Sequence, residues 1–363
     1  MRILVTGASG FIGSLLIPRL LSEGHRVRAL ARSPGRVESA LAQARSSRSL
    51  SQIEIARGDP LAGEGLREAL ADMEVAYYLM HSMERPRPPA RSSPSVQEDS
   101  NRRHRSQLLS HPSPTQAGTF AERERIAADA FAAAAAAAHV RRIVYLGALL
   151  PRPTAPAASP GEMPNPAEPA FARIPGSRHL ASREAVERIL LEAVPGSVAL
   201  RASIVIGARS RSFRLIVHLL ERLPVLTLPA WRRFRTQPID ARDMIEMLVA
   251  SASAAVAGRS LDVGGPDAFT YGEMIRRIAE LMLVNRPSLG LGASVTPLTA
   301  RLVAAITGED PELVTALMES LEGDLLPADD HAAELLDVHL HSFDSAVEHA
   351  LGEWEDSEPL AAR

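Results

Sequence analysis

Short apolar runs alternate with segments of helical period through the first two-thirds of the chain. Strands are predicted where the runs fall, at residues 3–5, 26–30, 54–56, 75–80, 143–146 and 197–206. Helices are predicted between them, at residues 12–22, 66–71, 120–139 and 181–193. Most gaps between strands are about 20 residues or longer, which leaves room for the crossover helices that parallel strands require. The alternation predicts an α/β fold with a doubly wound parallel sheet of the Rossmann type.

Beyond the sixth predicted strand the pattern becomes mostly helical. Helices are predicted at residues 213–222, 241–255, 271–282 and 313–321, with a short strand at 260–263. We expect residues 1–210 to form the Rossmann domain and residues 211–363 a smaller, mostly helical C-terminal substrate lobe, with 236–265 packing back on the first domain. Two proline-rich segments, 84–118 and 151–169, have no apolar period and are interpreted as flexible insertions.

A glycine motif joins the first predicted strand to the first predicted helix. Gly7 permits a tight turn, Gly10 allows the backbone to approach a pyrophosphate, and Gly13 allows the helix to pack closely on the strand. The helix N-terminus then offers N–H groups and a positive dipole end to phosphate oxygens. The motif predicts a dinucleotide site whose pyrophosphate lies among Gly7, Ser9, Gly10, Phe11, Ile12 and Gly13. The alternative is a tight glycine turn without a ligand.

Arginine follows the second predicted strand, where the residue type distinguishes the two nicotinamide dinucleotides. An acidic side chain there binds the ribose hydroxyls of NAD, whereas Arg32 is suited to bind the 2′-phosphate of NADP bidentately, with Ser33 and Arg36 beside it. We therefore expect NADP(H) rather than NAD(H). Asp59, after the third predicted strand, is placed to accept a hydrogen bond from the adenine amino group. The alternatives are that Arg32 is an ordinary solvated residue and Asp59 a turn residue.

Composition narrows the classes of function. The 363 residues include no cysteine, which excludes disulfides, thiolate chemistry and cysteine-based metal sites. All 40 basic residues are arginine, so no lysine acts as a proton carrier or forms a Schiff base. The net charge of −3 gives no reason to expect a nucleic-acid partner, and no metal site is predicted. The longest apolar tract, 130–138, is too short to span a membrane, and we expect a cytoplasmic protein.

Several further motifs extend over about residues 1–290. They read Thr-Gly-Ala-Ser-Gly-Phe-Ile-Gly at 6–13, Arg-Ile-Val-Tyr-Leu-Gly at 142–147, Ser-Arg-His-Leu-Ala-Ser-Arg at 177–183, Leu-Arg-Ala-Ser-Ile-Val-Ile-Gly at 200–207 and Gly-Gly-Pro-Asp at 264–267. Together they resemble the short-chain dehydrogenase/reductase superfamily, and more narrowly its atypical branch near the NmrA-like and complex-I-accessory-subunit-like NAD(P)H-binding proteins. The resemblance implies a Rossmann fold, a nicotinamide cofactor and, in an enzyme, a small-molecule substrate.

Standard members of that superfamily carry a Tyr-x-x-x-Lys pair and a serine or threonine after the fifth strand, and this chain departs at each position. The tyrosine position falls on His179, the lysine position on Arg183, and the serine position has no hydroxyl side chain. In an enzyme, His179 is expected to donate the substrate proton, because the pKa of histidine lies near neutrality. Arg183 is then expected to hold the cofactor ribose or phosphate. His81 and Ser82, after the fourth predicted strand, are expected to line the nicotinamide pocket.

Two functions remain open from the sequence. The first is an oxidoreductase that transfers hydride from NADPH to a hydrophobic carbonyl, enone or quinone-like substrate, beside apolar residues of 203–231. The alternative is a non-catalytic NADP(H)-binding redox sensor or an accessory or assembly subunit, in which His179 only begins a helix. Apolar residues followed by Trp231 among arginines also leave peripheral membrane contact by 219–235 as an alternative to a lid over the substrate.

Overall fold

The structure is a computed structural model. It describes residues 1–43, 52–80, 119–151, 177–284, 286–290, 303–305, 307–308 and 311–356. The two predicted insertions, 84–118 and 151–169, lie outside the described residues except for Pro151.

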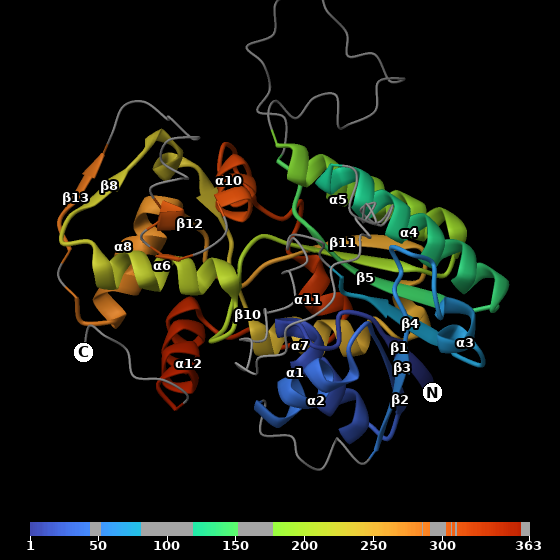
Figure 1. Cartoon of the computed structure of the whole chain (residues 1–363). Helices are drawn as coiled ribbons and strands as arrows, with labels where there is room; N and C mark the ends of the chain where they lie inside the picture. Colours follow the sequence, from blue (N-terminus) through green and yellow to red (C-terminus); the bar gives the residue numbers. More distant parts are fainter. Residues whose placement is uncertain are drawn as a thin grey trace, which may run out of the picture.

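A seven-stranded parallel sheet forms the centre of the N-terminal part (Figure 1). Its strands are β1 (Arg2–Val5), β2 (Arg26–Ala31), β3 (Ile53–Arg57), β4 (Val75–Tyr78), β5 (Arg142–Ala148), β6 (Val198–Ala202) and β11 (Arg259–Val263). They lie in the order β11-β6-β5-β4-β1-β2-β3, and each neighbouring pair is parallel. The predicted doubly wound sheet is confirmed. The strand order reverses direction at β1, between β2 and β4, and sheets of this kind bind ligands at the carboxyl ends of the strands beside such a reversal.

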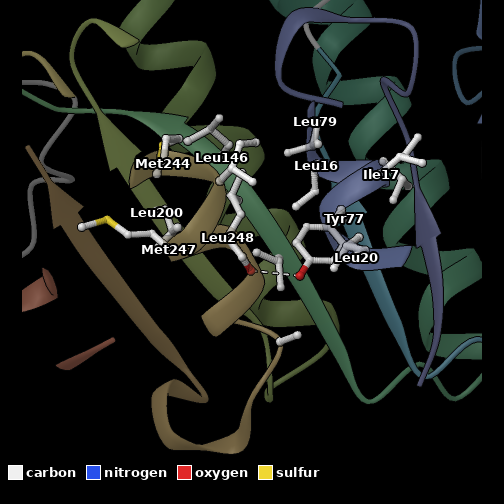
Figure 2. Close-up of a cluster of buried hydrophobic side chains, with 14 of the residues drawn as sticks. Leu16, Ile17, Leu20, Tyr77, Leu79, Leu146, Leu200, Met244, Met247 and Leu248 are labelled. Carbon is white, nitrogen blue, oxygen red and sulfur yellow. Dashed lines mark hydrogen bonds between the residues drawn. The ribbon is translucent and has the colours of Figure 1, made fainter. Parts of the chain in front are cut away.

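Helices cover both faces of the sheet, and buried apolar side chains fill the space beneath them (Figure 1). One face carries α1 (Phe11–Ser22), α2 (Pro34–Gln43) and α7 (Ala241–Ala250), and the other carries α3 (Leu66–Leu70), α4 (Phe120–Ala137) and α5 (Arg178–Ala193). Figure 2 shows leucine, isoleucine and methionine side chains of α1 and α7 packed around Tyr77 of β4. The Tyr77 hydroxyl donates to the Leu248 carbonyl at 2.9 Å, so this buried phenol is already paired.

The sixth predicted strand is shorter than the sequence pattern indicates. The strand leaves the main sheet after Ala202, and its continuation, β7 (Val205–Ile206), pairs with β10 (Ile239–Asp240) instead. The apolar run from 197 to 206 therefore serves two sheets, which a period-two pattern does not reveal. The helix α2 had no predicted counterpart, because its sequence is mostly polar and small.

A C-terminal lobe lies beside the sheet and has its own core (Figure 1). Its helices are α6 (Arg211–Arg222), α8 (Tyr271–Leu281), α10 (Pro311–Glu319) and α12 (Phe343–Glu355), with the 3₁₀ turn η4 (Ala230–Arg233). The helix α11 (His331–Leu335) and the 3₁₀ turn η5 (Ala254–Val256) pack instead on the core of the N-terminal part. The short strands β8 (Leu226–Leu228) and β13 (Ser288–Gly290) pair with each other, as do β9 (Arg235–Thr236) and β12 (Phe269–Thr270). The helix α12 was not predicted, yet its Trp354 is among the largest fully buried side chains.

Most apolar side chains of 203–231 pack inside this lobe. Phe213, Val217 and Leu220 of α6 are fully buried in its core. Trp231 is 8% exposed and meets the ring of Tyr271 edge-on, with ring centroids 6.1 Å apart. These buried side chains do not line the hydrophobic substrate pocket that the sequence predicts, and the burial of Trp231 disfavours the alternative of membrane contact by 219–235. No helix within the described ranges is long and apolar enough to cross a membrane.

Candidate cofactor site

The glycine loop between β1 and α1 is held tightly against the end of β4. Gly7 has φ of 65°, in the left-handed region, and an added Cβ would lie 2.5 Å from the Leu79 carbonyl oxygen. The Thr6 hydroxyl donates to the Tyr77 carbonyl at 3.0 Å and accepts from the Leu79 amide at 3.1 Å. The tight turn expected of Gly7 is present, and only glycine fits it without strain.

The first turn of α1 lies directly on this loop. An added Cβ at Gly13 would lie 2.3 Å from the Gly7 carbonyl oxygen and 2.9 Å from the Ala8 Cα atom. The N-cap residue is Gly10, so no side chain caps the first turn, and that turn contains no acidic residue. Its amides and the positive end of the helix dipole thus face outward at the carboxyl end of β1, an arrangement suited to an anion.

A hollow of about 410 Å³ opens beside the loop, where β2 ends and α2 begins. It is lined by Ser9, Ser33, Gly35, Arg36, Ser39, Ala40 and Arg209. The lining presents three hydroxyls and two guanidinium groups and no carboxylate. Arg32, just before Ser33, is exposed at the end of β2. The structure thus brings the predicted Ser9 and Arg36 together with Ser33, and adds Arg209, which no sequence motif indicated. Arg32 is not among the residues that line the hollow.

Asp59 lies in a turn after β3. Its Oδ1 atom accepts from the Leu61 amide at 3.0 Å, and its backbone exchanges hydrogen bonds with Glu64. The turn role weighed for Asp59 accounts for these contacts. His81 and Ser82, expected at the nicotinamide, lie outside the described residues.

His179 lies in the first turn of α5, against the ring of Phe120, with ring centroids 6.0 Å apart. Its Nδ1 atom is buried and has no hydrogen-bond partner among the residues that the structure describes. Burial, together with the nearby charge of Arg183, lowers the pKa of His179 to about 3. The sequence-based expectation of a pKa near neutrality is wrong. At neutral pH the imidazole is therefore uncharged, and it is poorly suited to donate a proton to a substrate.

Arg183 is buried and forms an ion pair with Glu124. Its side chain is 3% exposed, and its Nη2 atom donates to Oε1 of Glu124 on α4 at 2.7 Å. Glu124 is equally buried and also accepts from the Ser182 hydroxyl at 2.9 Å. Arg183 therefore joins α5 to α4. Its ion pair with Glu124 disfavours the predicted role of holding the cofactor ribose or phosphate, which stays a prediction.

None of the tyrosines takes the place of the superfamily's proton donor. All four are buried, and burial raises the pKa of each, to about 12 for Tyr145. The hydroxyl of Tyr145 donates to the Arg183 carbonyl at 3.3 Å, and that of Tyr77 is paired with Leu248.

A second cavity, of about 190 Å³, lies at the carboxyl end of β11, near the opposite edge of the sheet. Its polar groups are already paired with one another. The Gln237 side-chain amide donates to the Gly265 carbonyl at 2.7 Å, and Asp262 accepts from the Ala328 amide at 2.9 Å. We assign no cofactor to this cavity. Among the described residues, no cluster of histidine and acidic side chains is suited to hold a metal ion.

Comparisons with known proteins found a matching family and similar solved structures. Residues 7–173 match the NAD(P)H-binding family. This part of the chain is therefore similar to NAD(P)H-binding domains. No curated protein matches the sequence.

Solved structures similar to this chain cover nearly its whole length. A UDP-glucuronic acid 4-epimerase from Bacillus cereus, in complex with UDP-glucuronic acid and NAD, is 18% identical with a TM-score of 0.63, covering 98% of this chain and 99% of its own. A nucleoside-diphosphate-sugar epimerase from Staphylococcus aureus is 13% identical with a TM-score of 0.64, covering 96% and 100%. Pal from Bacillus thuringiensis is 16% identical with a TM-score of 0.64, covering 98% and 99%. The Rossmann fold that the resemblance implies is confirmed by these structures.

The imidazole of His179 is expected to remain neutral between about pH 5 and 8. Since its pKa in the folded protein lies below the ordinary value of 6.5, His179 contributes stability that is present above that value and lost as the pH falls toward about 3. NMR of the histidine ring nitrogens measures this directly, with His179→Gln to assign the resonance. A midpoint near the ordinary value would contradict the burial that we describe.

Proposed function

We propose that the protein binds NADP(H) at the carboxyl edge of its parallel sheet. The observation that supports this most strongly is the carboxylate-free hollow with Ser33 and Arg36, immediately beside an uncapped helix and a glycine loop. The pyrophosphate would lie against Gly7, Ser9, Gly10, Phe11, Ile12 and Gly13, and the 2′-phosphate against Arg32. The adenine would lie near Asp59, and the nicotinamide near His81 and Ser82.

The preference for NADP(H) over NAD(H) rests on the end of β2. Arg32 and Ser33 stand where NAD-binding sheets carry an acidic residue that binds the ribose hydroxyls. A guanidinium pairs with a phosphate through two parallel hydrogen bonds, and no carboxylate lines the hollow to repel one. The Bacillus cereus epimerase holds NAD, so this chain would differ from that relative in its cofactor.

Replacing Arg32 by alanine is expected to weaken NADPH binding by about 1–3 kcal/mol and to leave NADH binding nearly unchanged. The reason is that only NADPH carries the 2′-phosphate. Titration of both cofactors followed by nicotinamide fluorescence measures the difference. Arg26→Ala, at the exposed opposite end of the same strand, serves as the matched control and should alter neither affinity. Equal weakening of both cofactors by Arg32→Ala would rule out the 2′-phosphate assignment.

For the bound cofactor's role, the side chains at the superfamily's catalytic positions favour the non-catalytic alternative. Hydride transfer needs the cofactor and a substrate held in the right geometry, and reduction of a carbonyl also needs a proton. The low pKa of His179 and the ion pair of Arg183 leave neither suited to supply or assist that proton. We therefore propose that the protein is an NADP(H)-binding redox sensor or accessory subunit. We favour this function over that of a reductase of hydrophobic carbonyls, enones or quinones.

Cofactor oxidation separates these two roles. NADPH is incubated with the protein and a panel of quinones, enones and aldehydes, and the absorbance of reduced nicotinamide is followed. The proposal predicts tight NADPH binding without oxidation. Turnover of any substrate would establish an oxidoreductase, and His179→Phe would then show whether the neutral imidazole takes part. The bound UDP-sugar of the Bacillus cereus relative makes sugar nucleotides a useful addition to the panel.

A further inference from the structure

Arg209 reaches the cofactor hollow from the C-terminal lobe. It lies in the turn between β7 and α6, two residues before the helix that provides Phe213 and Val217 to the lobe core. Its Nη1 atom donates to the Ser14 hydroxyl of α1 at 2.9 Å and, more weakly, to the Ala40 carbonyl of α2 at 3.5 Å. The side chain is thus held in place by two helices of the N-terminal domain.

The charge of Arg209 is not neutralised within the described part of the chain. Both hydrogen bonds go to uncharged oxygens, and no carboxylate of a described residue forms an ion pair with Arg209. Burial is the main influence that lowers the pKa of Arg209, with Arg214 acting in the same direction and Glu353 opposing it. A half-buried guanidinium without a counter-ion is costly, and a bound anion would offset that cost.

The hollow supplies the rest of an anion site. Arg36 lines it together with Arg209, so two positive charges face one cavity. Ser33 adds a hydroxyl, which can donate a hydrogen bond to a phosphate oxygen, whereas the Ser39 hydroxyl donates to the Gly35 carbonyl at 2.8 Å. Arg36 lies in the first turn of α2, and Ser33 directly precedes that helix.

We propose that Arg209 binds the 2′-phosphate of NADP(H) together with Arg36, so that the C-terminal lobe takes part in selecting the cofactor. This inference rests on the proposed function. A guanidinium held by Ser14 and Ala40 through Nη1 keeps Nε and Nη2 for a phosphate. Phosphate binding would then tie the turn before α6 to the start of α2, and the lobe would respond to NADP(H) but not to NAD(H).

The test is titration of the full chain and of Arg209→Gln with NADPH and with NADH. The glutamine keeps most of the polar contact area but removes the charge. NADPH binding is expected to weaken roughly ten- to hundredfold, and NADH binding to change less than about twofold. Arg222→Gln, at the far exposed end of α6, is the matched control and should leave both affinities unchanged.

The outcomes separate this inference from the proposed function. NADPH binding by the unaltered chain with no change in Arg209→Gln overturns the role of Arg209 alone. Equal weakening of NADPH and NADH also overturns it, because Arg209 would then contact the shared pyrophosphate or only hold the two parts of the chain together. Failure of the unaltered chain to bind NADPH overturns the proposed function itself. If Arg209→Gln does not fold, Arg209→Lys is measured instead, because it keeps the positive charge and removes the two parallel N–H donors of the guanidinium. Unchanged NADPH affinity and unchanged discrimination between the cofactors in Arg209→Lys would contradict bidentate binding by Arg209.

Discussion

Replacing Glu124 by leucine is expected to lower the free energy of unfolding by about 3–5 kcal/mol, because it leaves the buried guanidinium of Arg183 without its counter-ion. Urea unfolding followed by circular dichroism measures the change. The double variant Glu124→Leu/Arg183→Leu should recover most of the loss, since it removes both buried charges together.

An exposed ion pair on the same helix provides the control for this prediction. Arg125 and Asp129 form an ion pair at 3.0 Å, and both side chains are about half exposed. Asp129→Ala should therefore change the stability by less than about 1 kcal/mol. Full stability of Glu124→Leu combined with loss of cofactor binding would contradict our interpretation and return Arg183 to a role at the cofactor.

Replacing Gly13 by alanine is expected to abolish or greatly weaken NADPH binding and to destabilise the fold by about 1–3 kcal/mol. The added methyl group would lie 2.3 Å from the Gly7 carbonyl oxygen, so α1 must move away from the glycine loop and take the amides of Phe11 and Ile12 with it. Cofactor titration and thermal unfolding measure the two effects. Gly352→Ala is the matched control: its Cβ meets no atom within 4 Å on the exposed side of α12, so it should be neutral or slightly stabilising. Unchanged NADPH affinity in Gly13→Ala would show that the loop does not hold the cofactor.

The sequence pattern predicts the sheet well, because a parallel strand that is buried on both of its faces gives a short, continuous apolar run in the sequence. The runs that become β1, β2, β4 and β5 carry few polar residues, and the glycine motif marks where the first strand meets its helix. The amphipathic pattern of α6 and α8 likewise indicates helices. These features depend on residues close together in the sequence, and so they can be predicted from it.

The candidate site was harder to predict because its side chains come from distant parts of the chain. The spacing of His179 and Arg183 places both on one side of a helix, but only the fold shows that Glu124, on another helix, neutralises Arg183. The same limitation hid Arg209, which reaches the hollow from beyond the sixth strand. The pKa of His179 depends on burial beneath Phe120, and residue type alone gives only the value in water.

The most direct test of the account is titration of the unaltered chain with NADPH and with NADH. The glycine loop, the uncapped first turn of α1 and the arginine-lined hollow predict that NADPH binds at least about tenfold more tightly than NADH, a difference of about 1.4 kcal/mol. Tighter binding of NADH, or no binding of either cofactor, would contradict the account.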